Sequence, residues 1–416
     1  MAGESFRFIH ASDFHLETPL GDLDTLPSQL REAIATAPMK AAQAVFEAAL
    51  VENIDFVVLS GDLLNPVTAG PRGMSLLLNY FDKLHAKKTP VFWAASGADD
   101  PARWPEAAPL PPNVTLFPKN RTLSIPVQRA GRTICQVIGR SSEGRSQLHV
   151  PSYRVDPTDE FTVAVGAGSA DADSLAEGRF DYWALGGEHQ RTVITSASDM
   201  GAVYCGSPQG RSLDEPGPHG YTIVDIDADK TMRVQSMECD SFRYCNIELD
   251  AGEFATANDI RGVLGNRIAR LLHDNGSRHL IIGWDISVSS DSIQVVGDPA
   301  ELLTWLRRDF GHGTPAAWTA RLRVRPPKKY PKNWCDEDTI LGDYLRASER
   351  HAKTGGRDLN LAPFTEEYMG LSKSIASMLA DAQAAVRGEL LEEATLIGVE
   401  CLRGGKPTFA GTSEDR

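Results

Sequence analysis

The segment Phe8-Ile-His-Ala-Ser-Asp-Phe-His-Leu16 joins a short apolar strand to two residues that commonly bind metals. Alternate side chains of a strand point to the same side, so Asp13 and His15 are predicted to project together. A carboxylate oxygen beside an imidazole nitrogen suits Mn, Fe or Zn better than Mg or Ca. Because Asp and His two residues apart are common by chance, the value of this pair depends on partners elsewhere in the chain.

The first third of the chain alternates strands and helices. Repeated strand–helix–strand units predict right-handed crossovers and a mostly parallel sheet. Continuous apolar runs predict strands at 6–10, 55–60 and 90–95, and helical periodicity predicts helices at 40–53 and 74–84.

A region of short strands follows. Seven prolines between 101 and 126 first predict a long surface loop with little regular structure. Short apolar runs separated by Gly, Ser, Asp and Pro then predict a second sheet packed on the first. The expected strands are 133–138, 161–165, 182–185, 193–194, 202–204 and 221–226.

The remaining chain predicts two further parts. A helical pattern at 260–271 and strands at 279–288 and 320–325 indicate a small α/β unit. Beyond it, Tyr368 to Val386 carry an apolar stripe typical of an amphipathic helix. We therefore expect a first domain at 1–240, a cap at 241–335 and a helical C-terminal extension at 336–416.

Bulk composition limits the class of protein. The 416 residues are 42% hydrophobic and 24% charged, which is typical of a soluble globular protein. The chain has no apolar run of the roughly 18 residues that a membrane span needs, and its first residues lack the features of a signal peptide. Its six scattered cysteines favour reduced thiols, so we expect a cytoplasmic protein. A net charge of −14 disfavours nonspecific nucleic-acid binding by the whole surface but is compatible with a local basic groove.

Residues with metal-binding side chains follow several predicted strands. Because ligands in α/β proteins gather at the carboxyl ends of strands, these residues are expected to meet at one edge. The candidates are Asp13 and His15, Asp62, Asp99 and Asp100, and His189. A set of this size is much harder to assign to chance than any one member.

At these positions the chain resembles a known family. The motifs Ala11-Ser-Asp-Phe-His-Leu16, Gly61-Asp62, Asp181-Tyr-Trp-Ala-Leu-Gly186 and Tyr204-Cys-Gly-Ser-Pro-Gln-Gly-Arg211 resemble those of calcineurin-like metallophosphoesterases. Within this family the motifs most resemble those of the SbcD/YhaO-type bacterial DNA repair exonucleases, and the segment from Tyr204, continued by Asp214-Glu215, carries the most specific match. The resemblance implies a two-sheet α/β/β/α sandwich with a small α/β cap and a helical C-terminal extension. It covers residues 5–240 well and the cap loosely.

The resemblance implies a pair of metal ions, about 3.5–4 Å apart, that clamp a phosphate and activate water. It places Asp13, His15 and His189 on the first ion and Asp62 on the carboxylate that bridges both ions. One divalent ion, manganese or alternatively iron or zinc, is therefore expected.

The positions implied for the second ion are degenerate. The Gly-Asn-His-Asp motif of the family reads Gly97-Ala-Asp-Asp100, so Ala98 replaces an asparagine ligand and Asp99 replaces the catalytic histidine. Ala167 and Gly187 stand where the family has two further histidine ligands.

Three interpretations remain open. The protein is a pseudo-enzyme that keeps the fold and one ion, or a one-metal phosphodiesterase with Asp99 or Asp100 as acid or ligand. In the third, the missing groups come from elsewhere, for instance His149, Glu188 or His219. Loss of several ligands and of the general acid favours greatly reduced or absent nuclease activity, because proton transfer alone contributes about 10²- to 10⁴-fold.

Basic residues and the family predict partners. Positive side chains near the end of the cap could meet a phosphate backbone, or they could form a solvated strand edge. Arg211 could also reach a phosphate, or it could serve to pack its own turn. The family implies DNA and an SMC-like ATPase as partners, a homodimer, and association with the nucleoid when DNA is bound. The cap residues concerned are Arg321, Arg323, Arg325, Lys328 and Lys329.

Overall fold

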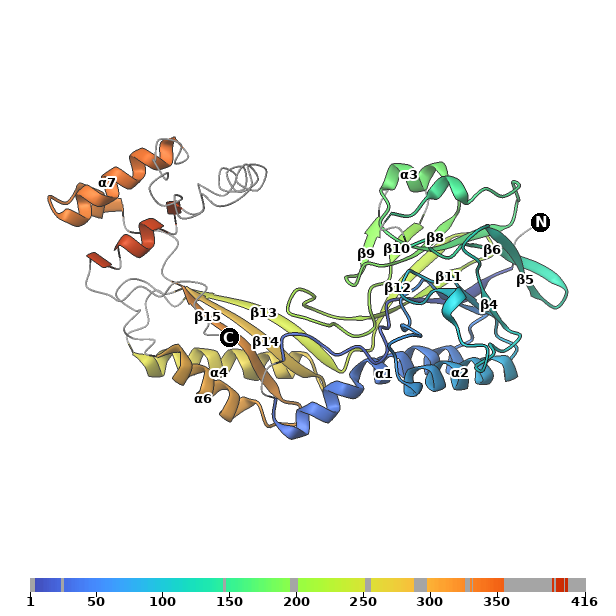
Figure 1. Cartoon of the computed structure of the whole chain (residues 1–416), viewed down its shortest axis with the longest axis horizontal. Coiled ribbons are helices and arrows are strands. Elements are labelled where there is room, and N and C mark those ends of the chain that lie inside the picture. Colours follow the sequence, from blue (N-terminus) through green and yellow to red (C-terminus); the bar gives the residue numbers. More distant parts are fainter. Residues whose placement is uncertain are drawn as a thin grey trace, which may run out of the picture. The chain divides into compact units, whose positions relative to one another are not determined.

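The protein forms two compact units of secondary structure (Figure 1). The first comprises Met1–Ile247, Arg267–Gly283 and Thr304–Arg321, and the second Glu248–Asn266, Trp284–Leu303 and Leu322–Arg416. The computed structural model describes residues 4–23, 26–144, 147–194, 201–250, 256–287, 298–325, 330, 332–354, 391–392, 394–399 and 401–402. The predicted boundaries near residues 240 and 335 stay predictions.

The first sheet has six strands in the order β12-β11-β1-β2-β3-β4. Strands β1 to β4 are parallel to one another, and β11 pairs with β1 in antiparallel register, with Phe6 opposite Ile226. The bounds are β1 (Phe6–Ala11), β2 (Phe56–Leu59), β3 (Val91–Trp93), β4 (Val114–Leu116), β11 (Gly220–Ile226) and β12 (Met232–Glu238).

A second six-stranded sheet has the order β5-β6-β7-β8-β10-β9. Its four inner strands are parallel, and the edge strands β5 and β9 are antiparallel to their neighbours. The bounds are β5 (Leu123–Arg129), β6 (Arg132–Gly139), β7 (Phe161–Ala167), β8 (Tyr182–Gly186), β9 (Thr192–Ile194) and β10 (Gly201–Tyr204).

The main core fills the space between these sheets. Phe8 and Phe56 of the first sheet stack at 4.7 Å between ring centroids, and Tyr182 of the second meets Phe8 edge-on at 5.5 Å. Such aromatic pairs stabilise a core beyond the effect of burial alone. The outer face of the first sheet is covered by α1 (Ser28–Val51) and α2 (Pro71–Ala86), and that of the second by η2 (Val150–Ser152) and α3 (Ala172–Glu177). The predicted two-sheet α/β sandwich is confirmed.

A third, three-stranded sheet has the order β13-β14-β15. In the first unit, Phe242, Ile281 and Trp318 of this sheet pack with Leu30 and Ile34 from the N-terminal half of α1. The bounds are β13 (Phe242–Asp250), β14 (His279–Ser287) and β15 (Ala317–Arg325), accompanied by α4 (Ala257–Asp274) and α6 (Pro299–Phe310), then η3 (Lys332–Asp336) and α7 (Ile340–Lys353).

Two local predictions were wrong. The proline-rich region at 101–126 is not a plain loop, because it contains η1 (Pro101–Arg103), all of β4 and the start of β5. Trp104 packs edge-on against Trp93 at 5.3 Å and thereby holds this region against the sheet. The first helix also begins at Ser28 rather than near residue 40, with Pro38 inside it.

Two other features concern helices. None of the helices in the described ranges is long and apolar enough to cross a membrane. The predicted stripe from Tyr368 to Val386 lies outside the residues that the structure describes.

Candidate metal centre

Asp13 and His15 lie in a loop directly after β1. The strand ends at Ala11, and both residues adopt left-handed backbone angles, with φ of 53° and 45°. Their amides donate to the carbonyls of Gly61 and Asp62, each at 2.9 Å, so this loop pairs with the loop after β2. The predicted strand alternation is therefore not what brings the two side chains together. Left-handed non-glycine residues cost free energy and cluster at functional sites.

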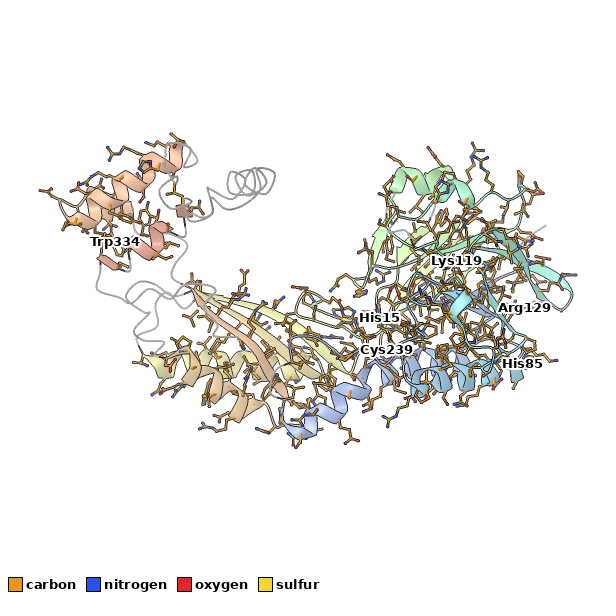
Figure 2. The ribbon with its side chains drawn as sticks, in the orientation of Figure 1. His15, His85, Lys119, Arg129, Cys239 and Trp334 are labelled. Atoms are coloured by element: carbon orange, nitrogen blue, oxygen red, sulfur yellow. The ribbon has the colours of Figure 1, made fainter. Side chains whose placement is uncertain are left out.

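Three side chains form a compact group of potential metal donors. One ligand atom from each of Asp13, His15 and His189 lies within 4.8 Å of the others. The Nε2 atoms of the two histidines are 2.9 Å apart, and the Gly187 amide donates to both Asp13 carboxylate oxygens at 3.1 Å. His15, labelled in Figure 2, keeps part of its ring exposed, whereas Asp13 is buried.

The protonation state of His15 suits the binding of a divalent ion. Burial raises the pKa of Asp13 to about 7, and burial together with the nearby charge of Arg211 lowers the pKa of His15 to about 4. His15 is therefore neutral at pH 7, the form that binds metals. One carboxylate and two imidazoles suit manganese, iron or zinc, so the donor set fits the predicted cofactor.

Asp62, the predicted bridging carboxylate, lies near this group but outside it. Its charge is felt by both Asp13 and His15, yet it does not belong to the set of atoms within 4.8 Å. The Ser96 hydroxyl donates to Asp62 Oδ1 at 2.6 Å. Asp62 thus contacts Ser96, which directly precedes the Gly97–Asp100 segment that the resemblance assigns to the second ion.

The positions that the resemblance assigns to ligands of a second ion lie near these loops. A Cβ atom on Gly61 would lie 3.0 Å from the Cβ of Ala167, so Ala167 borders the loop that carries Asp62. The Ala98 amide donates to Ser96 Oγ at 3.0 Å, and Gly187 contributes only its amide to Asp13. In the described part of the chain, no second group of metal donors forms here.

Asp99 serves a buried turn. Its carboxylate accepts the amide of Ser96 at 2.6 Å, the indole N–H of Trp93 at 2.9 Å and the amide of Leu63 at 3.3 Å. Burial and the neighbouring Asp62 raise the pKa of Asp99. A carboxylate anchored by three N–H donors is fixed in place, unlike a mobile general acid.

Asp100 is engaged away from the donor group. It accepts the amide of Ala102 at 2.9 Å at the start of η1 and pairs with Lys119 at 2.6 Å. The hydrogen bond from Lys119 lowers the pKa of Asp100.

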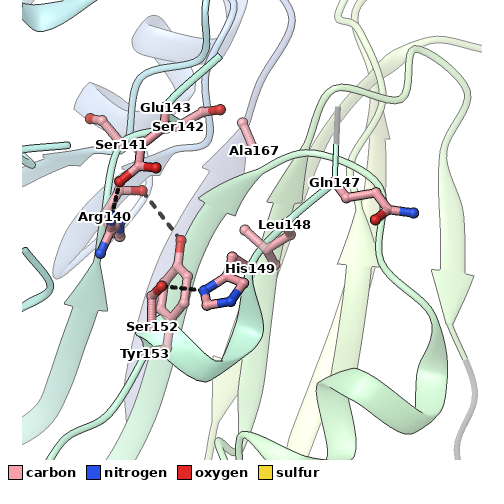
Figure 3. A pocket seen from close by; sticks show the side chains of 10 residues that line it. All are labelled: Arg140, Ser141, Ser142, Glu143, Gln147, Leu148, His149, Ser152, Tyr153 and Ala167. Carbon is pink, nitrogen blue, oxygen red and sulfur yellow. Dashed lines mark hydrogen bonds and ion pairs between the residues drawn. The ribbon is translucent and has the colours of Figure 1, made fainter. Parts of the chain in front are cut away.

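The three residues that could have rebuilt the site lie in different places. His149 contacts Ser152 Oγ at 2.5 Å in a pocket of about 40 Å³ whose lining includes Ala167 (Figure 3). The ring of His219 is buried between the carbonyls of Ser207, at 3.0 Å, and Glu215, at 3.1 Å. Glu188 is exposed. None of the three belongs to the donor group found among the described residues.

Glu215 is the functional candidate that sequence reasoning missed. Its Oε1 lies 2.6 Å from Nδ1 of His189, and its Oε2 accepts the amide of Arg211 at 2.9 Å. The hydrogen bond with Glu215 raises the pKa of His189. The available signal was its place in the segment from Tyr204 onward, which carries the most specific resemblance.

The basic candidates divide into two groups. Arg211 is buried beside the donor group, and its guanidinium donates to the carbonyls of Thr18 at 3.4 Å and Pro19 at 3.1 Å. On β15, Arg321 donates to Asn246 Oδ1 at 3.4 Å, and Arg323 is exposed. Lys328, Lys329 and the side chain of Arg325 lie outside the described residues.

Known proteins offer a partial match. No family model matches the chain. The chain is 27% identical over 243 residues to the "Uncharacterized metallophosphoesterase YhaO" of Bacillus subtilis (strain 168). The similarity supports the metallophosphoesterase superfamily. It covers 53% of this chain and 57% of that relative, so the match spans little more than half the length of either protein.

A solved structure is also similar. The crystal structure of TT1561 of Thermus thermophilus aligns with 56% of this chain and 98% of its own, at a TM-score of 0.32 and 10% sequence identity.

Proposed function

We propose that this chain is an SbcD/YhaO-like metallophosphoesterase subunit of a DNA repair or DNA-end-processing complex, with reduced or lost nuclease activity. One observation carries the proposal. Among the described residues, only Asp13, His15 and His189 gather as a group able to hold an ion. The curated relative, a metallophosphoesterase by name, supports the superfamily. DNA and an SMC-like ATPase as partners rest on the resemblance, as does a cytoplasmic or nucleoid location.

The residues of the site support binding better than cleavage. A divalent ion held here would polarise a phosphate oxygen as a Lewis acid. Arg211, whose charge already acts on His15, is our candidate for a direct phosphate contact. Asp99 cannot easily protonate a leaving group, because Ser96, Trp93 and Leu63 donate to its carboxylate. General acid catalysis contributes about 10²- to 10⁴-fold, so its loss would leave a slow enzyme at best.

A second candidate is an active one-metal phosphodiesterase. The buried guanidinium of Arg211 favours it, because a fixed cation beside an ion can stabilise charge that develops on a phosphate. In this alternative the site is simpler than that of the family but still cuts DNA.

Metal analysis and a nuclease assay separate the two candidates. Protein purified with manganese is expected to carry one ion per chain and to cleave linear DNA no faster than the Asp62→Ala variant. Manganese-dependent cleavage that disappears in Asp62→Ala would establish the one-metal enzyme. Two ions per chain would contradict our interpretation that the second site is lost. A metal-free protein would contradict our interpretation that Asp13, His15 and His189 bind an ion.

A further inference from the structure

The segment 204–219 contacts His189, one of the three candidate metal ligands, through both its backbone and its ring. The amide of Ser207 donates to the carbonyl of His189 at 2.9 Å. Gly206 adopts φ of 78°, and a Cβ atom there would lie 2.8 Å from the carbonyl oxygen of His189 and from the amide nitrogen of Arg191. Only glycine permits this close approach. The backbone of His189 is thus held from one side by this segment.

The same segment also holds the imidazole ring of His189. Glu215 Oε1 lies 2.6 Å from Nδ1, and the side chain of Glu215 is 15% exposed. A carboxylate only accepts hydrogen bonds, so this contact assigns the ring proton to Nδ1. The lone pair then lies on Nε2, the atom that faces His15 Nε2 at 2.9 Å in the donor group.

Glu215 is itself fixed by its own segment. The Arg211 amide donates to Glu215 Oε2 at 2.9 Å, and the Glu215 amide donates to the Ser212 carbonyl at 3.0 Å. The buried ring of His219 contacts the Glu215 carbonyl at 3.1 Å. The carboxylate therefore meets His189 in one defined orientation.

We propose that Glu215 is a positioning residue for the metal site, which fixes the tautomer and direction of the His189 ring. The proposal rests on the proposed binding of an ion by Asp13, His15 and His189. Outer partners of metal-binding histidines commonly contribute about 10- to 100-fold to metal affinity. It also gives a role to the segment from Tyr204 onward, which the donor residues alone leave unexplained.

The test compares Glu215→Gln with Asp214→Asn in the full chain. Both changes remove one negative charge from neighbouring positions, but Asp214 is exposed, and the carboxylate that pairs with His189 belongs to Glu215. Affinity for Mn²⁺ is measured by competition with a chromophoric chelator. We expect the Kd of Glu215→Gln to rise about 10- to 100-fold, and that of Asp214→Asn to stay near the wild-type value. Equal affinity of Glu215→Gln and wild type would overturn the proposal.

Two further measurements distinguish positioning from general support of the fold. The midpoint of urea unfolding in EDTA is expected to be the same for wild type and Glu215→Gln. If the midpoint of the variant falls far enough that partial unfolding explains its weaker Mn²⁺ binding, the positioning role is overturned. Glu215→Asp keeps the charge on a shorter side chain, so its Kd is expected between those of wild type and Glu215→Gln. If the wild type itself binds no Mn²⁺, the proposed function fails, which is a different result from equal binding by wild type and variant.

Discussion

His10 is buried in β1, the strand that leads into the loop of Asp13 and His15, and its ring contacts two hydroxyl groups. Nδ1 lies 3.0 Å from the hydroxyl of Tyr182, and Nε2 lies 2.9 Å from that of Ser60. Burial lowers the pKa of His10 from 6.5 to about 3. The ring is therefore neutral in the folded protein at any pH above this value, while in the unfolded chain it binds a proton below about 6.5.

This difference predicts a loss of stability in acid. Between about pH 6.5 and 3 the unfolded state binds the additional proton, so the free energy of unfolding falls as pH falls, by about 1.4 kcal/mol per pH unit. His10→Gln should remove this slope. Urea unfolding at pH 7, 6 and 5 in EDTA measures it as the difference between wild type and variant. Asp13 acts with the opposite sign in both proteins, because burial raises its pKa to about 7, and its effect cancels in the difference.

A matched control is His85→Gln, because His85 is exposed in the last turn of α2 (Figure 2). Its pH slope is expected to equal that of the wild type. The prediction is contradicted when His10→Gln and wild type lose stability in parallel as the pH falls.

At the scale of residues, the sequence predicts the candidate metal ligands better than the residues that hold those ligands in place. Asp13, His15 and His189 could be chosen because each follows an apolar strand, and strand ends meet at one edge. The side chain that supports His189 could not be chosen by this rule, because Glu215 lies 26 residues further along the chain, on a loop whose path depends on tertiary contacts. For Asp99, the sequence could not show that Ser96 and Trp93 occupy its carboxylate.

Glu17 connects the metal-site loop to the start of helix α2. No side chain caps this helix at Gly70, and no acidic residue lies in its first turn. Glu17 compensates from a distant part of the chain, because its Oε2 accepts the amide of Gly73 at 3.0 Å. A carboxylate at a helix N-terminus satisfies a free N–H and interacts favourably with the helix dipole.

Replacing Glu17 by alanine is therefore expected to destabilise the protein by about 0.5–2 kcal/mol, the usual cost of losing an N-terminal cap. Urea unfolding of Glu17→Ala measures the loss. Glu106→Ala, a change at an exposed loop position, is the control and should unfold like the wild type. Equal midpoints for the two variants would show that the contact with Gly73 contributes nothing.

At the scale of elements, buried strands are easier to predict than helices or edges. Strands such as β2 and β8 are continuous apolar runs, and their predicted bounds differ from the structure by one residue at most at each end. Helix α1 begins 12 residues earlier than predicted, at Ser28 instead of Lys40, and Pro38 lies inside it. Packing of Leu30 against the third sheet stabilises that first half, and no local pattern reports this contact. The edge strand β12 was missed because most of its residues are polar or partly exposed.

For the whole molecule, the two-sheet architecture follows from the order of predicted elements, but the strand pairing does not. Strand β11 lies beside β1 although more than 200 residues separate Phe6 from its partner Ile226. This pairing extends the first sheet on one side of β1, and β11 directly follows the segment 204–219 in the chain. The position of Glu215 behind His189 is thus a property of the complete fold.

Binding of an ion by this fold predicts that manganese stabilises the whole protein. A ligand that binds only the folded state adds RT ln(1 + [L]/Kd), which is about 2.7 kcal/mol at 100 times Kd. The dependence on concentration also counts the ions. One site gives about 1.4 kcal/mol per tenfold increase in Mn²⁺ well above Kd, and two sites give about twice that slope.

We expect the one-site slope for the wild type when urea unfolding is followed at increasing Mn²⁺, and none for His189→Ala. His149→Ala is the informative comparison, because His149 lies in the pocket beside Ala167, where a rebuilt second site would form. A single-ion protein keeps the wild-type slope in His149→Ala. A two-site slope that falls to the one-site value in this variant would instead show that His149 has replaced a lost ligand. The number of ions can therefore be read from stability alone, independently of any nuclease activity.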